Sequence, residues 1–429
     1  MTINRGFGAE APFMRNANNG PNVLWLVTVC TALSLFGDSA LYAVLPSQFD
    51  RFGLVVLQVG WLLSVNRLVR LPLNIPSGWL MRRFGPKWPL VIGLSLGSLS
   101  TLGFGLFHAF WALLACRCLW GVSWALIVVA SYGFVFASTE PSNRGRSTGI
   151  YTSFARFGGA LGAMIGGFLL DAIGTLPTMT VLASCGGGAV LLALLLPNSR
   201  DTRLHPVSSR TRATSIRLLE WARGLRKSDS TLWIVFLYNF IHLLVFSGIF
   251  YSTFGLYLRS AVGETITAGG VVIGVASLTG SLLFARNVFG LISSPLVGAL
   301  SDRTGRRARA LVVAESFGAL SLILLAIDRS PVMLIAGIVI ASVSYGVAPA
   351  LLLAWLGDQS KGRSGVAIGG FQTAGDLGSG LGPLIAYPLV AWIGIHATYA
   401  AAAALIVLAA ILVFRTDRRS SKMFARCDG

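Results

Sequence analysis

Apolar residues in this chain of 429 residues form long continuous blocks that alternate with short polar connections, as at 24–45, 88–107 and 332–355. A hydrocarbon core of about 30 Å is crossed by a helix of roughly 20 apolar residues, and about twelve blocks meet that criterion. Backbone groups in lipid must be hydrogen-bonded within their own segment, so the spans are predicted to be helices; the alternating strands of a membrane barrel are absent. The pattern predicts an all-α membrane protein with about twelve transmembrane helices.

One long polar and basic connector, residues 198–230, separates the first six predicted spans from the last six. The two halves also repeat: 77–87 aligns with 297–307, and 161–174 aligns with 381–394 at the same offset. Internal repeats of this kind are common in transporter folds and predict two pseudo-symmetric six-helix bundles. The predicted organisation is an amino-terminal tail at 1–23, a bundle at 24–197, a central loop at 198–230, a second bundle at 231–414 and a carboxy-terminal tail at 415–429.

The formal charge of +18 lies mainly on one side of the predicted spans. Most basic residues fall in the tails, the central loop and the short loops on that side, whereas the opposite loops keep Arg51, Arg259 and Arg329. By the positive-inside rule, this asymmetry predicts a multi-pass protein of the cytoplasmic (inner) membrane with both termini in the cytoplasm. The basic charge therefore requires no nucleic-acid partner, and a charged fraction of 12% excludes a soluble domain.

A glycine-bounded basic loop follows the second predicted span and recurs after the eighth. It resembles the signature loop of the major facilitator superfamily, although Arg82 replaces the family's Asp and Pro86 replaces a basic residue in the first copy. The resemblance covers the whole chain and implies two bundles that open alternately to the two sides of the membrane. It also implies that the loops act as conformational gates, through Gly78, Arg83, Gly85, Gly298, Asp302, Arg303, Gly305 and Arg306.

Charged residues also lie deep within predicted spans, where each costs roughly 2.5–3.5 kcal/mol to insert. Asp171 and Glu315 are placed near span ends, where their side chains are expected to reach water. His242 is interpreted as an interhelical hydrogen-bonding residue rather than a ligand. The deep charges are Asp38, Arg67, Arg70, Arg117, Arg156, Arg286 and Asp376.

The family fold packs span two against span eleven and span five against span eight. The resemblance therefore implies that Arg67 or Arg70 reaches Asp376 and that Arg156 approaches Arg286. Five deep arginines against two deep acids leave an excess of positive charge, which predicts a negative substrate or a phospholipid head group between the bundles. In the alternative, the arginines are fixed struts that bond backbone carbonyls, Asp38 and Asp376. The predicted substrate-binding residues are Arg67, Arg70, Arg156, Arg286, Gln372 and Asp376.

Asp38 and Arg117 are predicted to form the proton-coupling site. The two residues lie at similar depth in spans one and four, so protonation of Asp38 would break a pair with Arg117. Arg117 and Gly121 also resemble the arginine motif of the fourth span that is often found in proton-coupled family members. In span five, Gly162-Ala163 replaces the Gly-Pro pair of the family's antiporters, so the antiporter motif is incomplete.

The leading hypothesis is proton-coupled uptake of a small organic anion or zwitterion by alternating access. The first alternative is a proton-antiport exporter of drugs or amphiphilic, lipid-like compounds, and the second is a transport-dead membrane sensor. An enzyme is not expected, because the chain has four His and neither an HExxH nor a GxSxG motif. No cofactor or metal is predicted. Membrane lipid is the expected surrounding, and a monomer is expected to suffice because one chain holds both halves.

Overall fold

The computed structural model describes residues 20–140, 143–198, 230–268, 270–304, 307–327, 330–359 and 364–427. The amino-terminal tail up to residue 19 and nearly all of the predicted central loop lie outside the described residues.

The amino-terminal half contains six long helices, in agreement with the hydrophobic blocks. A short 3-10 helix, η2 (Phe49–Phe52), joins the first two, and the other connections are equally short. The helices are α1 (Gly20–Ser47), α2 (Val56–Phe84), α3 (Lys87–Leu106), α4 (Phe110–Ala137), α5 (Arg144–Ile173) and α6 (Thr175–Leu194).

The carboxy-terminal half repeats the arrangement with six more spans. The first span is continuous but changes its winding: α8 (Ser230–Leu243) passes through a π-helical segment, η4 (Leu244–Phe250), into α9 (Tyr251–Val262). A β-hairpin of β1 (Thr265–Ala268) and β2 (Val271–Gly274), which the sequence pattern did not predict, then precedes the eighth span. The remaining helices are α10 (Val275–Thr304), α11 (Arg307–Ile327), α12 (Pro331–Gln359), α13 (Ser364–Ile393) and α14 (Ile395–Cys427).

Within the described residues the chain thus has twelve long spans, counting α8–η4–α9 as one, which confirms the predicted fold class. Ten of these are long and apolar enough to cross a membrane, and α2 and α13 are the two that are not among them. These two helices pack against each other along the seam between the bundles. Polar side chains on both helices can therefore face protein instead of lipid, which is where intramembrane charges are tolerated.

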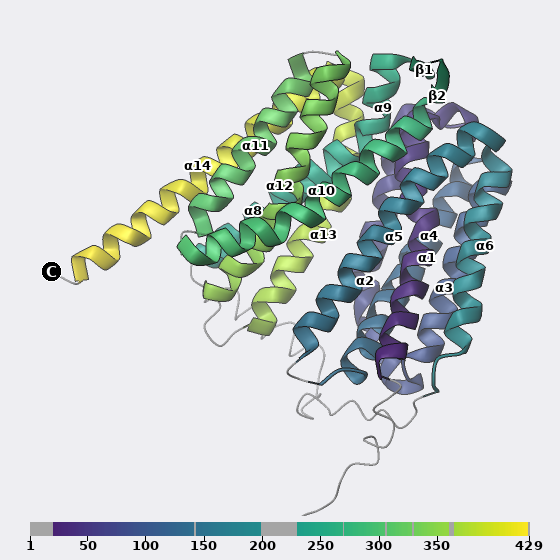
Figure 1. Ribbon diagram of the computed structural model, residues 1–429, viewed down its shortest axis with the longest axis horizontal. Coiled ribbons are helices and arrows are strands. Elements are labelled where there is room, and N and C mark those ends of the chain that lie inside the picture. The colour runs from purple at the N-terminus through teal and green to yellow at the C-terminus, as the bar shows by residue number, and fades with distance from the viewer. Residues whose placement is uncertain are drawn as a thin grey trace, which may run out of the picture.

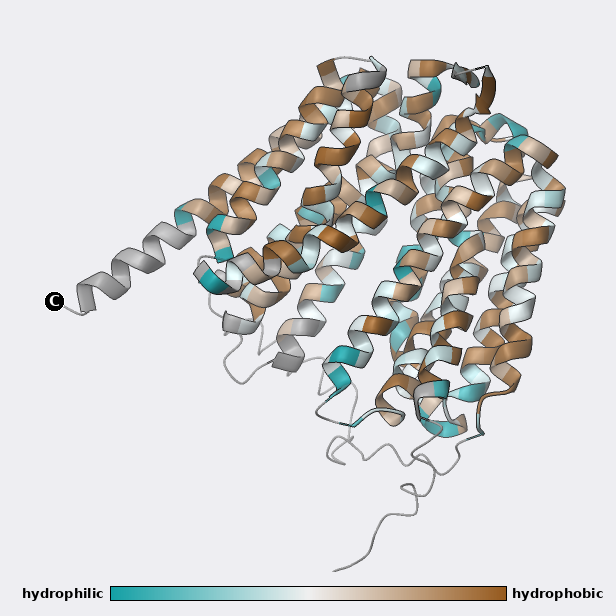
Figure 2. Cartoon of the chain, in the orientation of Figure 1, coloured by the Kyte–Doolittle hydropathy of each residue, from teal (hydrophilic) through white to brown (hydrophobic). Residues whose placement is uncertain are grey.

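The two bundles stand side by side, with α10 crossing diagonally from the hairpin end towards the opposite end (Figure 1). The seam is built from α5 against α10 and from α2 against α13, the pairs that the family resemblance implied. Figure 2 shows that apolar positions predominate along the helices. Large side chains such as Trp111 and Trp392 are exposed on outer faces, as expected for a surface surrounded by lipid.

The end of the molecule with the hairpin and η2, called here the hairpin side, holds the bundles together by polar contacts. Asp171 at the end of α5 accepts hydrogen bonds from the backbone N–H and the hydroxyl of Ser277, at 2.7 and 2.6 Å. Its carboxylate thus caps the start of α10 in the other bundle. Arg259 of α9 pairs with Asp50 of η2, and this hydrogen bond holds the pKa of Asp50 below its ordinary value.

Candidate functional site

A cavity of about 220 Å³ lies between the two bundles, midway along the spans. Residues of both bundles line it, and they combine four deep charges with aromatic and hydroxyl groups. Four of the eight residues predicted as substrate or proton sites are therefore brought to one cavity: Asp38, Arg67, Arg70 and Arg156. The other lining residues that bear on its chemistry are Tyr42, Asn66, Trp120, Trp124, Ser247, Tyr251, Asn287 and Tyr345.

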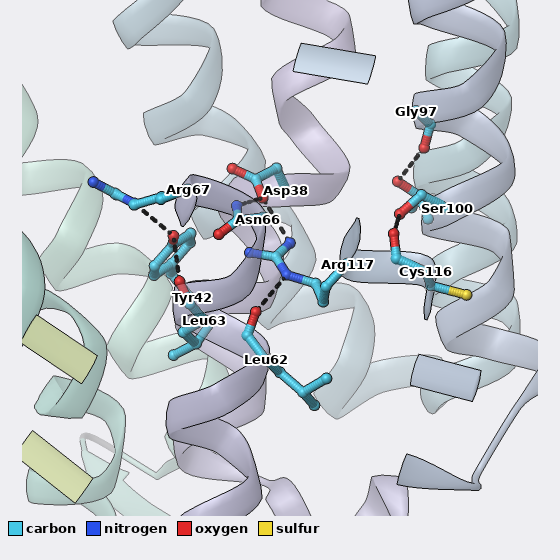
Figure 3. Close-up of polar contacts among 11 residues, drawn as sticks. Asp38, Tyr42, Leu62, Leu63, Asn66, Arg67, Gly97, Ser100, Cys116 and Arg117 are labelled. Carbon is cyan, nitrogen blue, oxygen red and sulfur yellow. Dashed lines mark hydrogen bonds and ion pairs between the residues drawn. The ribbon is translucent and has the colours of Figure 1, made fainter. Parts of the chain in front are cut away.

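Asp38 and Arg117 form an ion pair at one wall of this cavity (Figure 3). The Nη1 atom of Arg117 lies 2.7 Å from Oδ1 of Asp38, and its Nε donates to the carbonyl of Leu62 at 2.9 Å. Arg117 is only 1% exposed, whereas Asp38 is 14% exposed and lines the cavity. The carboxylate therefore stands between a buried cation and the space where a solute or a proton can arrive.

Arg67 and Arg70 extend from α2 to the opposite bundle. Arg67 donates from Nε to the Tyr42 hydroxyl at 3.2 Å and from Nη1 to the Ser247 hydroxyl of η4 at 3.1 Å. Arg70 forms an ion pair with Asp376 of α13. The pair crosses the seam, as the packing of span two on span eleven implied. Arg67, in contrast, is held by hydroxyl groups rather than by an acid.

Arg156 separates the central cavity from a second one. The second cavity has a volume of about 290 Å³, and Arg156, Asn287 and Tyr345 belong to the lining of both. Ser153 and Ser294 line its far part and lie towards the end of the molecule opposite the hairpin side. No ion pair joins Arg156 to another described residue. Its charge is therefore available to a solute in either cavity.

Arg286 is buried behind the cavity wall, 1% exposed. Its guanidinium lies 3.8 Å from the ring centre of Tyr345 and 5.2 Å from that of Tyr251, both of which line the cavity. Nη2 donates to the carbonyl of Phe246 at 3.1 Å, while Nε and Nη1 have no hydrogen-bond partner among the described residues. The expected approach of Arg286 to Arg156 is therefore indirect. The ring of Tyr345 contacts Arg286, and Tyr345 lines both cavities together with Arg156.

Gln372 and the loop residues are placed apart from the cavity. Gln372 is exposed and does not belong to its lining. Gly85 has a backbone φ of +78°, which glycine adopts without strain, so the loop glycine has a local structural reason. The guanidinium of Arg83 lies 5.3 Å from the ring of Trp79, one turn back on α2. Arg83 and Gly85 lie where α2 ends and the loop begins. The gating role assigned to the eight loop residues stays a prediction.

The second copy of the loop is described in part. Gly298 and Asp302 belong to the last turns of α10, and Arg303 is exposed there. Gly305 and Arg306 lie outside the described residues. Gly78 lies within α2, where an added Cβ would meet nothing closer than the Arg82 side chain at 3.9 Å.

The expectation that Glu315 reaches water is wrong. Glu315 is fully buried, and its Oε1 lies 2.5 Å from Nδ1 of His242, which is also fully buried. The error lies in depth: Glu315 is two turns inside α11, too far from the helix end for its side chain to reach water. The interpretation of His242 as an interhelical hydrogen-bonding residue is confirmed. Asp171 lies near the end of α5, as expected, and its carboxylate caps α10 across the seam.

The sequence profile of the Major Facilitator Superfamily matches residues 27–286 and 277–426, which together span nearly the whole chain. The chain is 26% identical over 345 residues to the multidrug resistance protein MdtG of Escherichia coli, covering 80% of each chain. It is 31% identical over 195 residues to a probable vesicular acetylcholine transporter-B of Danio rerio, covering 42% of this chain but only 39% of that protein.

Solved structures show the same fold at low identity. A point mutant of the nucleoside transporter NupG superposes with a TM-score of 0.73 and 14% identity, over 92% of this chain and 99% of that one. A bacterial homologue of the human lysosomal transporter Spinster, inward-facing and unoccupied, gives 0.69 and 17%, over 96% and 98%. The chain thus belongs to the Major Facilitator Superfamily and is a multi-pass integral membrane transporter of a small-molecule substrate, not an enzyme.

Proposed function

We propose that this transporter takes up an organic anion or zwitterion, driven by protons, and binds it in the cavity between Arg67 and Arg156. The charge balance of the cavity carries the proposal. Asp38 is paired with Arg117, and Arg70 is paired with Asp376. Arg67 has hydroxyl partners, and Arg156 has no acidic partner among the described residues. Asp38 and Asp376 also attract Arg67, but each already forms an ion pair with another arginine. The cavity thus keeps an excess of two cations, and a carboxylate or phosphate group can balance it.

In the proposed orientation, the protein lies in the inner membrane and both of its termini lie in the cytoplasm. The positive-inside asymmetry supports it, since the described basic residues Arg82, Arg83, Lys87, Arg144 and Arg146 lie at helix ends opposite the hairpin side. The polar contacts on the hairpin side and the second cavity towards the other end support an inward-facing state. A monomer is proposed to suffice, since one chain supplies both walls of the cavity.

A thermal-shift screen tests the substrate class. Organic anions, zwitterions, cations, neutral solutes and lipids are each added to the detergent-purified protein. A ligand at 100 times its Kd stabilises the folded state by about 2.7 kcal/mol. Anions or zwitterions are expected to raise the melting temperature of the wild type but not of Arg156→Gln. Gly187→Ala serves as a matched control, because an added Cβ at that position meets no other atom within 4 Å. Equal shifts in the wild type and Arg156→Gln would remove Arg156 from the binding site.

The proposed coupling step is protonation of Asp38. A proton on the carboxylate removes the charge that neutralises Arg117, so loading and unloading of this proton change the contact between α1 and α4. Asp38→Asn keeps an oxygen that accepts from Arg117 but cannot cycle a proton. In proteoliposomes with the ligand found by the screen, this variant is expected to lose transport driven by a pH gradient and to keep exchange of ligand across the membrane. Transport that still follows the pH gradient would exclude Asp38 as the coupling site.

Export of an amphiphilic compound is a second candidate. The similarity to the multidrug resistance protein MdtG over 80% of both chains favours it, as does a pair of stacked tryptophans in the cavity lining. The rings of Trp120 and Trp124 lie 6.1 Å apart between centres. In the same screen, stabilisation by lipophilic cations or neutral amphiphiles alone would favour this candidate over uptake of an anion.

A further inference from the structure

A second pair of titratable groups is buried inside the carboxy-terminal bundle, away from the cavity. His242 of α8 and Glu315 of α11 are both 0% exposed, and their Nδ1 and Oε1 atoms lie 2.5 Å apart. The other carboxylate oxygen of Glu315 accepts a hydrogen bond from the hydroxyl of Ser344 on α12, at 3.1 Å. Neither residue lines either of the two cavities.

The surroundings of the pair supply no second counter-charge among the described residues. On α8, the Tyr238 hydroxyl interacts electrostatically with Glu315 and has no hydrogen-bond partner. On α13, Asp376 is paired with Arg70. On α14, Tyr399 is bonded to Thr253, and the buried residues Ala402, Ala403, Ile406 and Ala409 are apolar.

Because the pair has no second counter-charge, its net charge depends on the number of protons that it holds. With two protons, the pair is neutral overall, either as histidinium and carboxylate or as imidazole and carboxylic acid. With one proton, it carries a negative charge that the buried surroundings do not compensate. The Nε2 atom of His242 is buried without a partner, so it is the position from which that proton is gained or lost without breaking the bond to Glu315. The pair thus has two charge states that differ by one proton.

The π-helical segment η4 connects the pair to the cavity. His242 lies directly before the segment, and its ring is 5.1 Å from that of Phe246 between centres. The Phe246 carbonyl accepts from Arg286, which is a buried cation without an acidic partner among the described residues. One residue on, the Ser247 hydroxyl accepts from Arg67 of the opposite bundle. π-helical turns often mark functional sites, and this one holds two cations by adjacent residues.

We infer that His242 and Glu315 form a proton-binding site of the carboxy-terminal bundle, and that η4 carries its change of charge to the cavity. Loss of the proton leaves a negative charge on the pair, directly beside Phe246, whose ring faces His242 and whose carbonyl accepts from Arg286. A displacement of Phe246 changes the hold on Arg286 and shifts the segment that also bonds Arg67. The inference adds a second proton site to the proposed coupling, and it does not require Asp38 to titrate or the substrate to be an anion.

Proton uptake by the purified full-length protein tests the site. The number of protons bound is measured from a pH below the ordinary histidine pKa of about 6.5 up into the alkaline range, so that both charge states of the pair are covered. The double variant His242→Gln/Glu315→Gln keeps an amide pair that can hydrogen-bond but cannot titrate. It is expected to take up one proton fewer than the wild type. Glu140→Gln, which removes an exposed carboxylate, is expected to match the wild type. Equal uptake by the wild type and the double variant would overturn the site.

Two further measurements complete the test. Hydrogen exchange of peptides that cover 244–250, corrected for the intrinsic effect of pH, is expected to change with pH in the wild type and not in the double variant. The same change in both would overturn the link through η4. If the double variant does not fold, infrared spectra of the wild type decide the matter: a carboxyl or imidazole signal that changes with pH but is slow to shift in deuterated water is expected, and its absence would overturn the site.

Discussion

Replacement of Asp38 by alanine is expected to lower the free energy of unfolding by about 3 kcal/mol, because it leaves Arg117 as a buried cation without a partner. The backbone carbonyl of Leu62 accepts only one of the guanidinium's donors, and Nη2 already has no partner among the described residues. The measurement is denaturant or thermal unfolding of the detergent-purified protein at neutral pH.

Two variants separate this effect from simple loss of packing. Asp38→Asn keeps an acceptor for Arg117 and is expected to lose distinctly less stability than Asp38→Ala. The double variant Asp38→Ala/Arg117→Leu removes the stranded charge and is expected to recover part of the loss. If Asp38→Ala and the wild type unfold alike, Arg117 is neutralised by some other group.

Replacement of Gly280 by leucine is expected to abolish transport, because it prevents the bundles from closing on the hairpin side. A Cβ at Gly280 of α10 would overlap the Ala163 carbonyl of α5 and come within 2.9 Å of the Met164 Cα. Both neighbours are backbone atoms, so a rotamer change cannot relieve the clash. In proteoliposomes, transport of the ligand found by the screen is expected to fall to background.

Cysteine labelling reports whether the bundles are held apart. Ser277 is buried at the hairpin side, 3% exposed, so Ser277→Cys is expected to resist a water-soluble maleimide in an otherwise unchanged chain. In combination with Gly280→Leu, the same cysteine is expected to be labelled. Gly280→Leu alone corrects for the native cysteines, and Gly187→Leu is the matched control, because that glycine faces open space. Protection of the cysteine in the Gly280→Leu background would show that α5 and α10 adapt to the added side chain.

Depth in the membrane was predictable from the sequence for Asp38, Arg117 and Arg286 but not for Glu315, and the face of a helix was predictable only in part. Asp38 and Arg117 share a depth, and they do form a pair. The implied packing of span two on span eleven predicted that Arg67 or Arg70 reaches Asp376, and the structure shows that Arg70 does. Arg286 has the expected depth, but aromatic rings enclose its guanidinium and separate it from the cavity. Enclosure of this kind depends on residues of other helices, which spacing along one helix does not reveal.

Two local features had no signal in the hydropathy pattern. The π-helical turn of η4 packs against α13, where a Cβ added at Gly248 would overlap the backbone of Gly382 and approach that of Gly378. The hairpin before α10 is short, and its residues from Thr265 to Gly274 run directly into the apolar block that follows, so hydropathy does not separate them from that span. Hydrophobic periodicity identifies long elements well, but it cannot place a change of winding within a span.

The polarity of α2 and α13 also has a consequence for how the protein is made. A helix enters the bilayer from the ribosome-bound translocon according to its own hydrophobicity, and an arginine near its centre opposes entry by roughly 2.5–3.5 kcal/mol. α2 carries Arg67 and Arg70 in its middle, and their partners lie mainly in the second bundle, which is synthesised more than a hundred residues later. α2 therefore depends for its retention during synthesis on α4, the helix of its own bundle against which it packs. It reaches its final polar environment only after α13 has been inserted.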